Sequence, residues 1–216
     1  MMMNLFSMFD PSTGYLSLNW MSMMLIFLIP SCFWKTPSKI MYMIMLVFNN
    51  LLKEIMMNTK NLKSCLIFMT LFFYILTNNL FSLFPYIFSS SAQLVFSLSL
   101  SLTLWMSIMM YGWTMKTNKM FSHLIPVSTP TLLMPFMVLI ESTSNIIRPW
   151  SLAIRLSANM IAGHILMSLL SNSMNNLLMM FMLMSLIMMF LMFETAVSFI
   201  QSYVFMTLTS LYYSEI

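Results

Sequence analysis

Residues 131–170 read TLLMPFMVLIESTSNIIRPWSLAIRLSANMIAGHILMSLL. The segment is apolar apart from a few polar and charged side chains, and as a helix it would measure ~60 Å, at about 1.5 Å per residue. This is twice the hydrocarbon thickness of a bilayer, which is ~30 Å. We therefore expect a helix that is steeply tilted or bent in a membrane, with Pro135 and Pro149 as the bends.

A second overlong apolar segment runs from about Met174 to Leu211 and would measure ~57 Å as a helix. Only a short polar stretch separates it from the first segment. Helices that cross a membrane at right angles do not need this length. The two segments therefore predict a tilted helical hairpin.

Arg155 lies in the middle of the first segment. A guanidinium at the centre of a membrane helix costs ~2.5–3.5 kcal/mol on insertion scales, and arginine does not avoid this cost by losing its proton. A fixed positive charge at that depth needs either a carboxylate partner or a water-filled site. Arg155 is therefore a functional candidate by default.

The composition predicts an all-α integral membrane protein. Of the 216 residues, 60% are hydrophobic and 6% are charged, whereas soluble domains contain about 25% charged residues. Long apolar runs without strict alternation favour helices over a β-barrel. The lysines are dispersed around helix ends, so the net charge of +4 does not indicate a nucleic-acid-binding surface.

We predict about five membrane helices and one interfacial amphipathic helix. Three spans precede the hairpin, at about 15–34, 64–84 and 92–115. Residues 40–61 begin apolar and then place polar side chains at three- and four-residue steps, which is typical of a helix in the headgroup plane. A short span with a ragged end is the alternative for this segment. Prolines in residues 117–130 prevent a continuous helix there.

The lysines predict the topology of the chain. They all lie on one side of the predicted spans, and the opposite connections contain none. The positive-inside rule puts these lysines in the matrix or cytoplasm, with the N-terminus on the outer side and the C-terminus on the lysine side.

The ionisable residues are distributed unevenly along the chain. The first three predicted spans contain no charged residue, whereas the last two segments contain Glu141, Arg148, Arg155, His164 and Glu194, together with the polar residues Asn145, Asn159 and Gln201. We interpret residues 1–216 as a single membrane domain, in which residues 1–120 form anchoring helices. Residues 121–216 would form the tilted hairpin that performs the chemistry.

Helical spacing predicts which of these side chains share a face. Glu141, Arg148 and Arg155 are separated by steps of seven residues, which keeps them within ~40° of one face. Asn159 lies one turn beyond Arg155, and His164 lies ~180° from it. Along the helix axis, Glu141 lies ~21 Å from Arg155 on one side, and His164 lies ~13 Å from it on the other. Proton-exchanging groups on either side of a permanent cation indicate two half-channels with a barrier between them.

Several of these residues also have a purely structural explanation. Glu141 could pair with Arg148 across two helical turns, and Arg148 could serve only the bend beside it. His164 and Gln201 could be hydrogen-bonding residues between packed helices. Glu194 has no basic residue near it in sequence, which disfavours a structural ion pair.

Two blocks of the hairpin resemble a known family. Residues 140–149, IESTSNIIRP, and residues 155–164, RLSANMIAGH, closely resemble subunit a of F-type ATP synthases, mitochondrial type. Residues 194–197 (ETAV) and 200–205 (IQSYVF) resemble the last helix of that family. The resemblance covers the whole chain in layout and residues 124–216 in motif. One departure is Ser128-Thr129-Pro130, because the family usually shows Gly-Thr-Pro at this point.

The resemblance implies a stator subunit of the ATP synthase membrane sector in the mitochondrial inner membrane. Such a subunit is not catalytic by itself, needs no cofactor or metal, and conducts protons through two offset half-channels. Its partners would be a rotating ring of c subunits, peripheral stalk subunits, other membrane subunits and the lipid bilayer. The N-terminus would lie on the intermembrane-space side and the C-terminus on the matrix side.

The resemblance also implies roles for individual residues. Arg155 matches the family's essential arginine, which faces a carboxylate of the ring and prevents a direct leak. Asn159 and Gln201 match the polar neighbours of that arginine in the family. His164 and Glu194 match the family's outer half-channel pair, and Glu141 matches its matrix half-channel acid. Arg148 and Asn145 would be either structural or part of the proton path.

Three other classes are less well supported by the residues. A redox-complex membrane subunit that binds haem needs paired histidines, and the sequence contains only His123, expected in a solvated loop, and His164. A structural membrane anchor would leave the concentration of charge in two helices unexplained. A solute transporter is disfavoured because we find no inverted repeat.

Overall fold

The structure, a computed structural model, describes residues 5–14, 16–28, 36–59, 61–84, 87–125, 129–173 and 177–215. Within these ranges the chain is helical and contains no strand. The helices long and apolar enough to cross a membrane are α1 (Lys39–Thr59), α2 (Leu62–Ser82), α3 (Leu94–Met115), α5 (Met134–Asn172) and α6 (Leu177–Glu215). The predicted all-α membrane fold class is confirmed.

The shorter helices bear on two predictions. The described part of the predicted first span forms the 3-10 helix η2 (Leu18–Leu28), so whether this segment crosses the membrane stays a prediction. Residues 15 and 29–34 of that prediction lie outside the described residues. The segment after α3 was expected to be a loop, but its first part forms α4 (Thr117–His123), so His123 ends a short helix. The remaining short helices are η1 (Leu5–Phe9), η3 (Ser90–Ala92) and η4 (Thr131–Leu133).

Helix α1 corresponds to the segment predicted to lie in the headgroup plane. It is also long and apolar enough to span a membrane, so its placement relative to the bilayer stays a prediction. Two of its regularly spaced polar side chains contact α6. Glu54 accepts a hydrogen bond from the Tyr203 hydroxyl (3.0 Å), and the Asn58 amide donates one to Ser210 (3.4 Å). These polar side chains therefore join α1 to α6.

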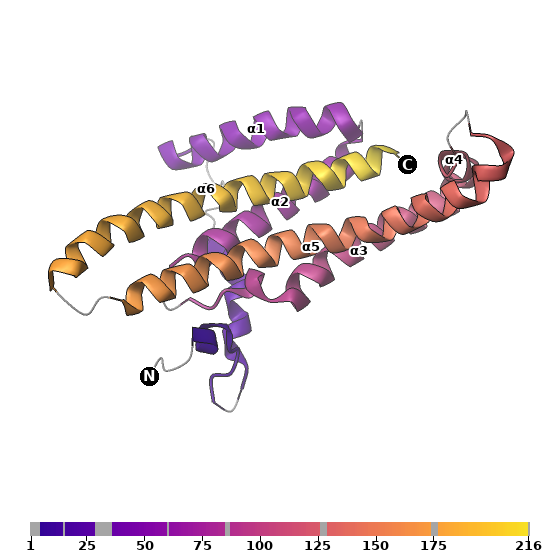
Figure 1. Cartoon of the computed structure of the whole chain (residues 1–216). Coiled ribbons are helices and arrows are strands. Elements are labelled where there is room, and N and C mark those ends of the chain that lie inside the picture. The colour runs from indigo at the N-terminus through magenta and orange to yellow at the C-terminus, as the bar shows by residue number, and fades with distance from the viewer. Residues whose placement is uncertain are drawn as a thin grey trace.

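The two 39-residue helices α5 and α6 form the predicted hairpin and lie side by side (Figure 1). Helix α1 packs along another side of α6, and α3 packs against α5. Helix α2 packs against both α1 and α6, so it lies at the centre of the apolar contacts. One core cluster joins α1, α2 and α6, and a second joins α2, α5 and α6; their buried members are Ile55, Cys65, Phe68, Met69, Phe72, Ile75, Leu152, Leu156, Phe205 and Met206.

The prolines of α5 do not divide the helix. Pro135 lies in its first turn, where the missing N–H would have no partner in any case, so the bend predicted there is wrong. Pro149 lies inside the helix and is buried, and the helix continues through it to Asn172. The register of side chains along α5 is therefore continuous from Glu141 to His164.

Small side chains allow α6 to approach its neighbours closely. Ser198, Ser202 and Ser210 are fully buried, and each hydroxyl donates a hydrogen bond to a backbone carbonyl three residues earlier in the helix. Small residues at helix contacts are the usual way in which membrane helices pack closely, because lipid provides no hydrophobic force between helices. The larger buried residues Phe205 and Met206 complete the same face.

We predict that Ser202→Leu destabilises the helix bundle by about 1–3 kcal/mol, because an isobutyl group has no space at a fully buried serine. The stability of the chain in detergent, followed by thermal unfolding, measures this effect. Ser185→Leu places the same side chain at an exposed position of the same helix and should change stability little. Equal unfolding temperatures for the two variants would contradict close packing at Ser202.

Candidate functional site

Helix α5 presents two different faces around its centre. Arg155 and Asn159 are exposed, whereas Leu152, Leu156 and Met160 are buried against the rest of the bundle. His164 lies on the buried side and is 9% exposed. The structure thus separates His164 from Arg155 by face, as the helical spacing predicts.

The Arg155 guanidinium has no ion pair or hydrogen bond within the described part of the chain. The ion pairs found there belong to another arginine, Arg148. Arg155 lies in a helix that is apolar enough to span a membrane, and its side chain points out of the bundle. The charge is therefore available to a group outside the chain, and lipid is an unfavourable neighbour for it.

Next to Arg155, a polar contact joins the two helices of the hairpin. The amide nitrogen of Asn159 donates a hydrogen bond of 3.1 Å to the side-chain oxygen of Gln201. Gln201 is 6% exposed, so this bond is shielded on the α6 side. The sequence pointed to both residues but could not show that they contact each other.

The next contact along the hairpin places Glu194 against α5. A Cβ atom built on Gly163 would overlap a carboxylate oxygen of Glu194, so this carboxylate occupies the space that a side chain at position 163 would need. The Oε1 atom of Glu194 and the Nε2 atom of His164 are both buried without a hydrogen-bond partner among the described residues. The ring of Phe9 lies edge-on to the His164 imidazole, at 6.1 Å between centroids.

A second charged site lies at the other end of the hairpin. We call Glu141, Arg148, Tyr212 and Glu215 the Arg148 cluster. The Nη1 atom of Arg148 donates a hydrogen bond of 2.6 Å to Glu215, and its Nη2 atom lies 3.8 Å from Glu141. The guanidinium carbon lies 5.0 Å from the centroid of the Tyr212 ring. The contact to Glu141 was one of the structural explanations open from the sequence, whereas the contact to Glu215 was not foreseen.

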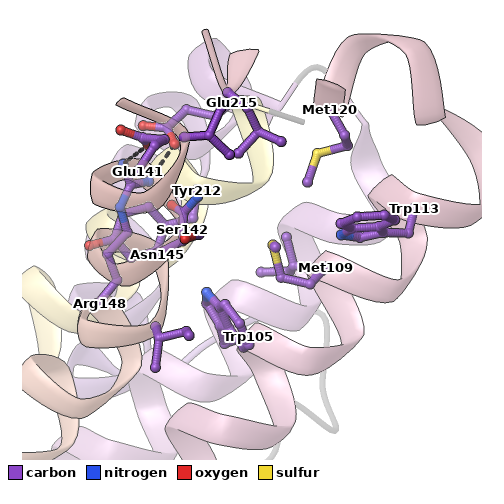
Figure 2. A pocket seen from close by; sticks show the side chains of 14 residues that line it. Trp105, Met109, Trp113, Met120, Glu141, Ser142, Asn145, Arg148, Tyr212 and Glu215 are labelled. Atoms are coloured by element: carbon purple, nitrogen blue, oxygen red, sulfur yellow. Dashed lines mark hydrogen bonds and ion pairs between the residues drawn. The ribbon is translucent and has the colours of Figure 1, made fainter. Parts of the chain in front are cut away.

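The Arg148 cluster lines one wall of a pocket of about 640 Å³. Figure 2 shows the opposite wall, where Trp105, Met109 and Trp113 of α3 lie with Met120 of α4. Asn145 and Ser142 also line this pocket, beside Glu141. The cavity is therefore polar on the side of the hairpin and apolar on the side of α3 and α4.

The cross-helix contacts fall in a consistent antiparallel order. Going along α5 from Arg148 to Asn159 and Gly163, the partners on α6 are Glu215, Gln201 and Glu194. This order could have been anticipated by pairing the two predicted segments outward from their turn. The contacts set Glu141 at one end of the hairpin and the pair His164 and Glu194 toward the other end, with Arg155 between them.

Comparison with known proteins assigns the family. A family model described as ATP synthase A chain matches residues 16–214. The chain belongs to the ATP synthase subunit a family. It is 50% identical to ATP synthase subunit a of Drosophila melanogaster over 224 residues, with 100% of both chains covered. The corresponding proteins of Anopheles gambiae and Aedes albopictus are 47% and 45% identical over 229 residues, also with full coverage of both chains.

Membership of this family establishes the overall role of the chain. It is a subunit of the mitochondrial type that translocates protons in the membrane sector of ATP synthase, as part of the stator, and it is not itself catalytic. It is a multi-pass membrane protein that assembles with other subunits of the enzyme. The redox-subunit and simple-anchor alternatives are therefore set aside.

We predict that Gly163→Ala impairs proton transport strongly, because the new methyl group would displace the Glu194 carboxylate. A displacement of about 1 Å can lower the rate of a positioned reaction as much as ~100-fold. Proton-driven ATP synthesis by the assembled enzyme in vesicles measures the effect.

Two further variants test the cause of this effect. Adding Glu194→Asp to Gly163→Ala shortens the acid and should restore part of the rate, whereas Ala162→Ser alters an exposed neighbour and should leave the rate unchanged. A normal rate in Gly163→Ala would show that the close approach to Glu194 has no role in transport.

Proposed function

We propose that protons reach and leave a rotating ring of c subunits through two half-channels that end on either side of Arg155. The observation that supports this most strongly is the exposed position of Arg155 on a continuous helix, with no partner among the described residues and titratable groups toward both ends. A partner that covers this face needs a carboxylate opposite Arg155. Each ring subunit would supply one in turn.

The outer half-channel would use His164 and Glu194. Both side chains have a buried polar atom without a partner within the described residues, and Glu194 comes from α6 against the backbone of α5. Buried polar groups of this kind need a hydrogen-bonding partner such as water, and a row of waters is also a route for protons. The space at Gly163 keeps the carboxylate beside the helix that holds Arg155.

The matrix half-channel would use Glu141 and the pocket beside it. Glu141, Ser142 and Asn145 provide polar atoms on the α5 wall of a cavity that is large enough for several waters. Glu141 would exchange protons between this cavity and the ring. Its proposed position on the matrix side follows from the lysine distribution, which also places the N-terminus in the intermembrane space and the C-terminus in the matrix.

The Asn159–Gln201 hydrogen bond would hold the two helices together beside Arg155. It fixes the register of α6 against α5 at the level where the ring carboxylate passes. This makes the hairpin, residues 121–216, the translocating part of one membrane domain, with residues 1–120 as its anchor and with peripheral stalk subunits as further neighbours.

The cycle follows from the electrostatics of the guanidinium. A positive charge favours the ionised form of a nearby carboxylate, so a ring carboxylate releases its proton toward the matrix half-channel as it approaches Arg155. The ionised carboxylate passes Arg155 and is reprotonated from the outer half-channel before it meets lipid. Each proton contributes ~2.3 kcal/mol per 100 mV of membrane potential. The fixed charge of Arg155 also prevents protons from passing directly between the half-channels.

We predict that Arg155→Ala abolishes proton-driven ATP synthesis, with a loss of at least ~100-fold, as for other single groups that act through their charge. The rate of ATP synthesis by the assembled enzyme in energised vesicles measures this loss, and passive proton leak measured in parallel should rise. Lys119→Ala removes an exposed positive charge outside the hairpin and should leave both quantities unchanged. Normal coupling in Arg155→Ala would end this proposal.

We predict that Glu194→Gln slows proton uptake from the outer side by about 100-fold, a typical contribution of a positioned acid or base. The amide fits the same space but does not exchange protons as a carboxylate does. Lowering the outer pH should restore part of the rate if protons then reach His164 without Glu194. Unchanged transport at every outer pH would show that Glu194 is structural.

A further inference from the structure

Two carboxylates share one guanidinium in the Arg148 cluster. Glu215 accepts a hydrogen bond from Nη1 at 2.6 Å, whereas Glu141 lies at 3.8 Å from Nη2, near the outer limit of an ion pair. Two different nitrogens of the guanidinium are thus directed to different acids. Glu215 is the closer partner, although it lies 67 residues away from Arg148 in the sequence.

The closer contact to Glu215 affects what Glu141 can do. Tyr212 faces the guanidinium from the same helix as Glu215, so α6 holds Arg148 by two contacts. A guanidinium held in this way does not close a short bidentate ion pair with Glu141, which is the strong form of an arginine–carboxylate contact. The Glu141 carboxylate remains beside the pocket with an oxygen available to other donors.

We propose that Glu215 is a positioning residue for proton exchange at Glu141, because it draws Arg148 toward α6 and keeps the Glu141 carboxylate out of a tight ion pair. The inference rests on the proposed function of Glu141 as the matrix-side acid. It adds the penultimate residue of the chain to the translocating site, with Arg148 as the group through which Glu215 acts.

The other groups around Glu141 do not provide a substitute for Glu215. On α5 the charged neighbour is Arg148, and on α6 the titratable groups are Tyr212 and Glu215. The pocket-lining residues from α3 and α4 are uncharged: Trp105, Ile108, Met109, Trp113 and Met120. Among the residues that line the pocket, Glu215 is therefore the one carboxylate that competes with Glu141 for Arg148.

A variant that removes this competition tests the proposal. In Glu215→Gln, Arg148 should close on Glu141 and favour its ionised form. The assembled enzyme is reconstituted in vesicles with its matrix face outward, and ATP-driven proton pumping is measured against external pH. Each rate is divided by the uncoupled ATP hydrolysis rate at the same pH, so that only the membrane sector is compared.

The expected result is a shift of the pumping profile. Protons enter from the matrix face in this direction, so a more firmly ionised Glu141 loses proton uptake at a lower pH. The alkaline limb should move to lower pH by about half a unit, so the pumping rate on that limb should be about threefold lower. A shift of this size is expected for an ion pair that is partly exposed. Glu215→Asp retains the charge and should restore most of the wild-type profile.

Two further variants separate this role from a structural one. Glu54→Gln makes the same change at a carboxylate that also contacts α6, through Tyr203, but lies away from the pocket, and it should not move the profile. In an Arg148→Gln background the substitution Glu215→Gln should have no further effect, because the shared cation is absent. An unchanged profile in Glu215→Gln, or an equal shift with and without Arg148, would overturn the proposal, as would the same shift in Glu54→Gln.

The proposed role of Glu141 fails in a different way. If Glu141→Gln pumps protons normally, Glu141 is not the matrix-side acid and the function proposed for this site is wrong. If Glu141→Gln blocks pumping while Glu215→Gln leaves the profile unchanged, the function holds and only the positioning role is lost. Should Glu215→Gln assemble poorly, Glu215→Asn removes the same charge with a shorter amide, and the same shift of the alkaline limb is expected of it.

Discussion

The close antiparallel contact between α5 and α6 is the constraint on which the other features of this protein depend. An apolar helix pair in lipid gains little from hydrophobic association, so its register has to come from packing and from polar contacts. Here the contacts are Arg148 with Glu215, Asn159 with Gln201, and the backbone at Gly163 with Glu194. The same polar groups that fix the register are the candidates for moving protons.

The remaining helices contact the hairpin on one side and leave the face with Arg155 exposed. Buried serines on α6 and the core around α2 support the hairpin from its inner side, while the face with Arg155 stays exposed. The hydrogen bond from Tyr203 to Glu54 joins α1 to the same helix. Helices α1 and α2 therefore support α6 in its position beside α5.

The sequence predicted the features that depend on local spacing. The two overlong helices and the opposite faces of Arg155 and His164 follow from apolar length and from 3.6 residues per turn, because Pro149 leaves α5 continuous. The 3-10 helix η2 in the described part of the predicted first span could not be predicted, because apolar composition alone does not distinguish a 3-10 helix from an α-helix. Contacts between side chains on different helices could not be predicted either. Glu215 and Arg148, for example, are far apart in the sequence, and no local pattern joins them. Gly163 gave no signal of its own, because the reason for a glycine there lies on α6.

The outward position of Arg155 also bears on the life of the subunit before assembly. Until another protein supplies a negative charge, the guanidinium is exposed on an apolar surface without a partner among the described residues, and the inserted chain bears the full cost of that charge in lipid. Docking removes this cost, so association stabilises the folded chain through linkage. An unassembled copy of the chain is therefore less stable than an assembled one, and it is more open to unfolding and removal.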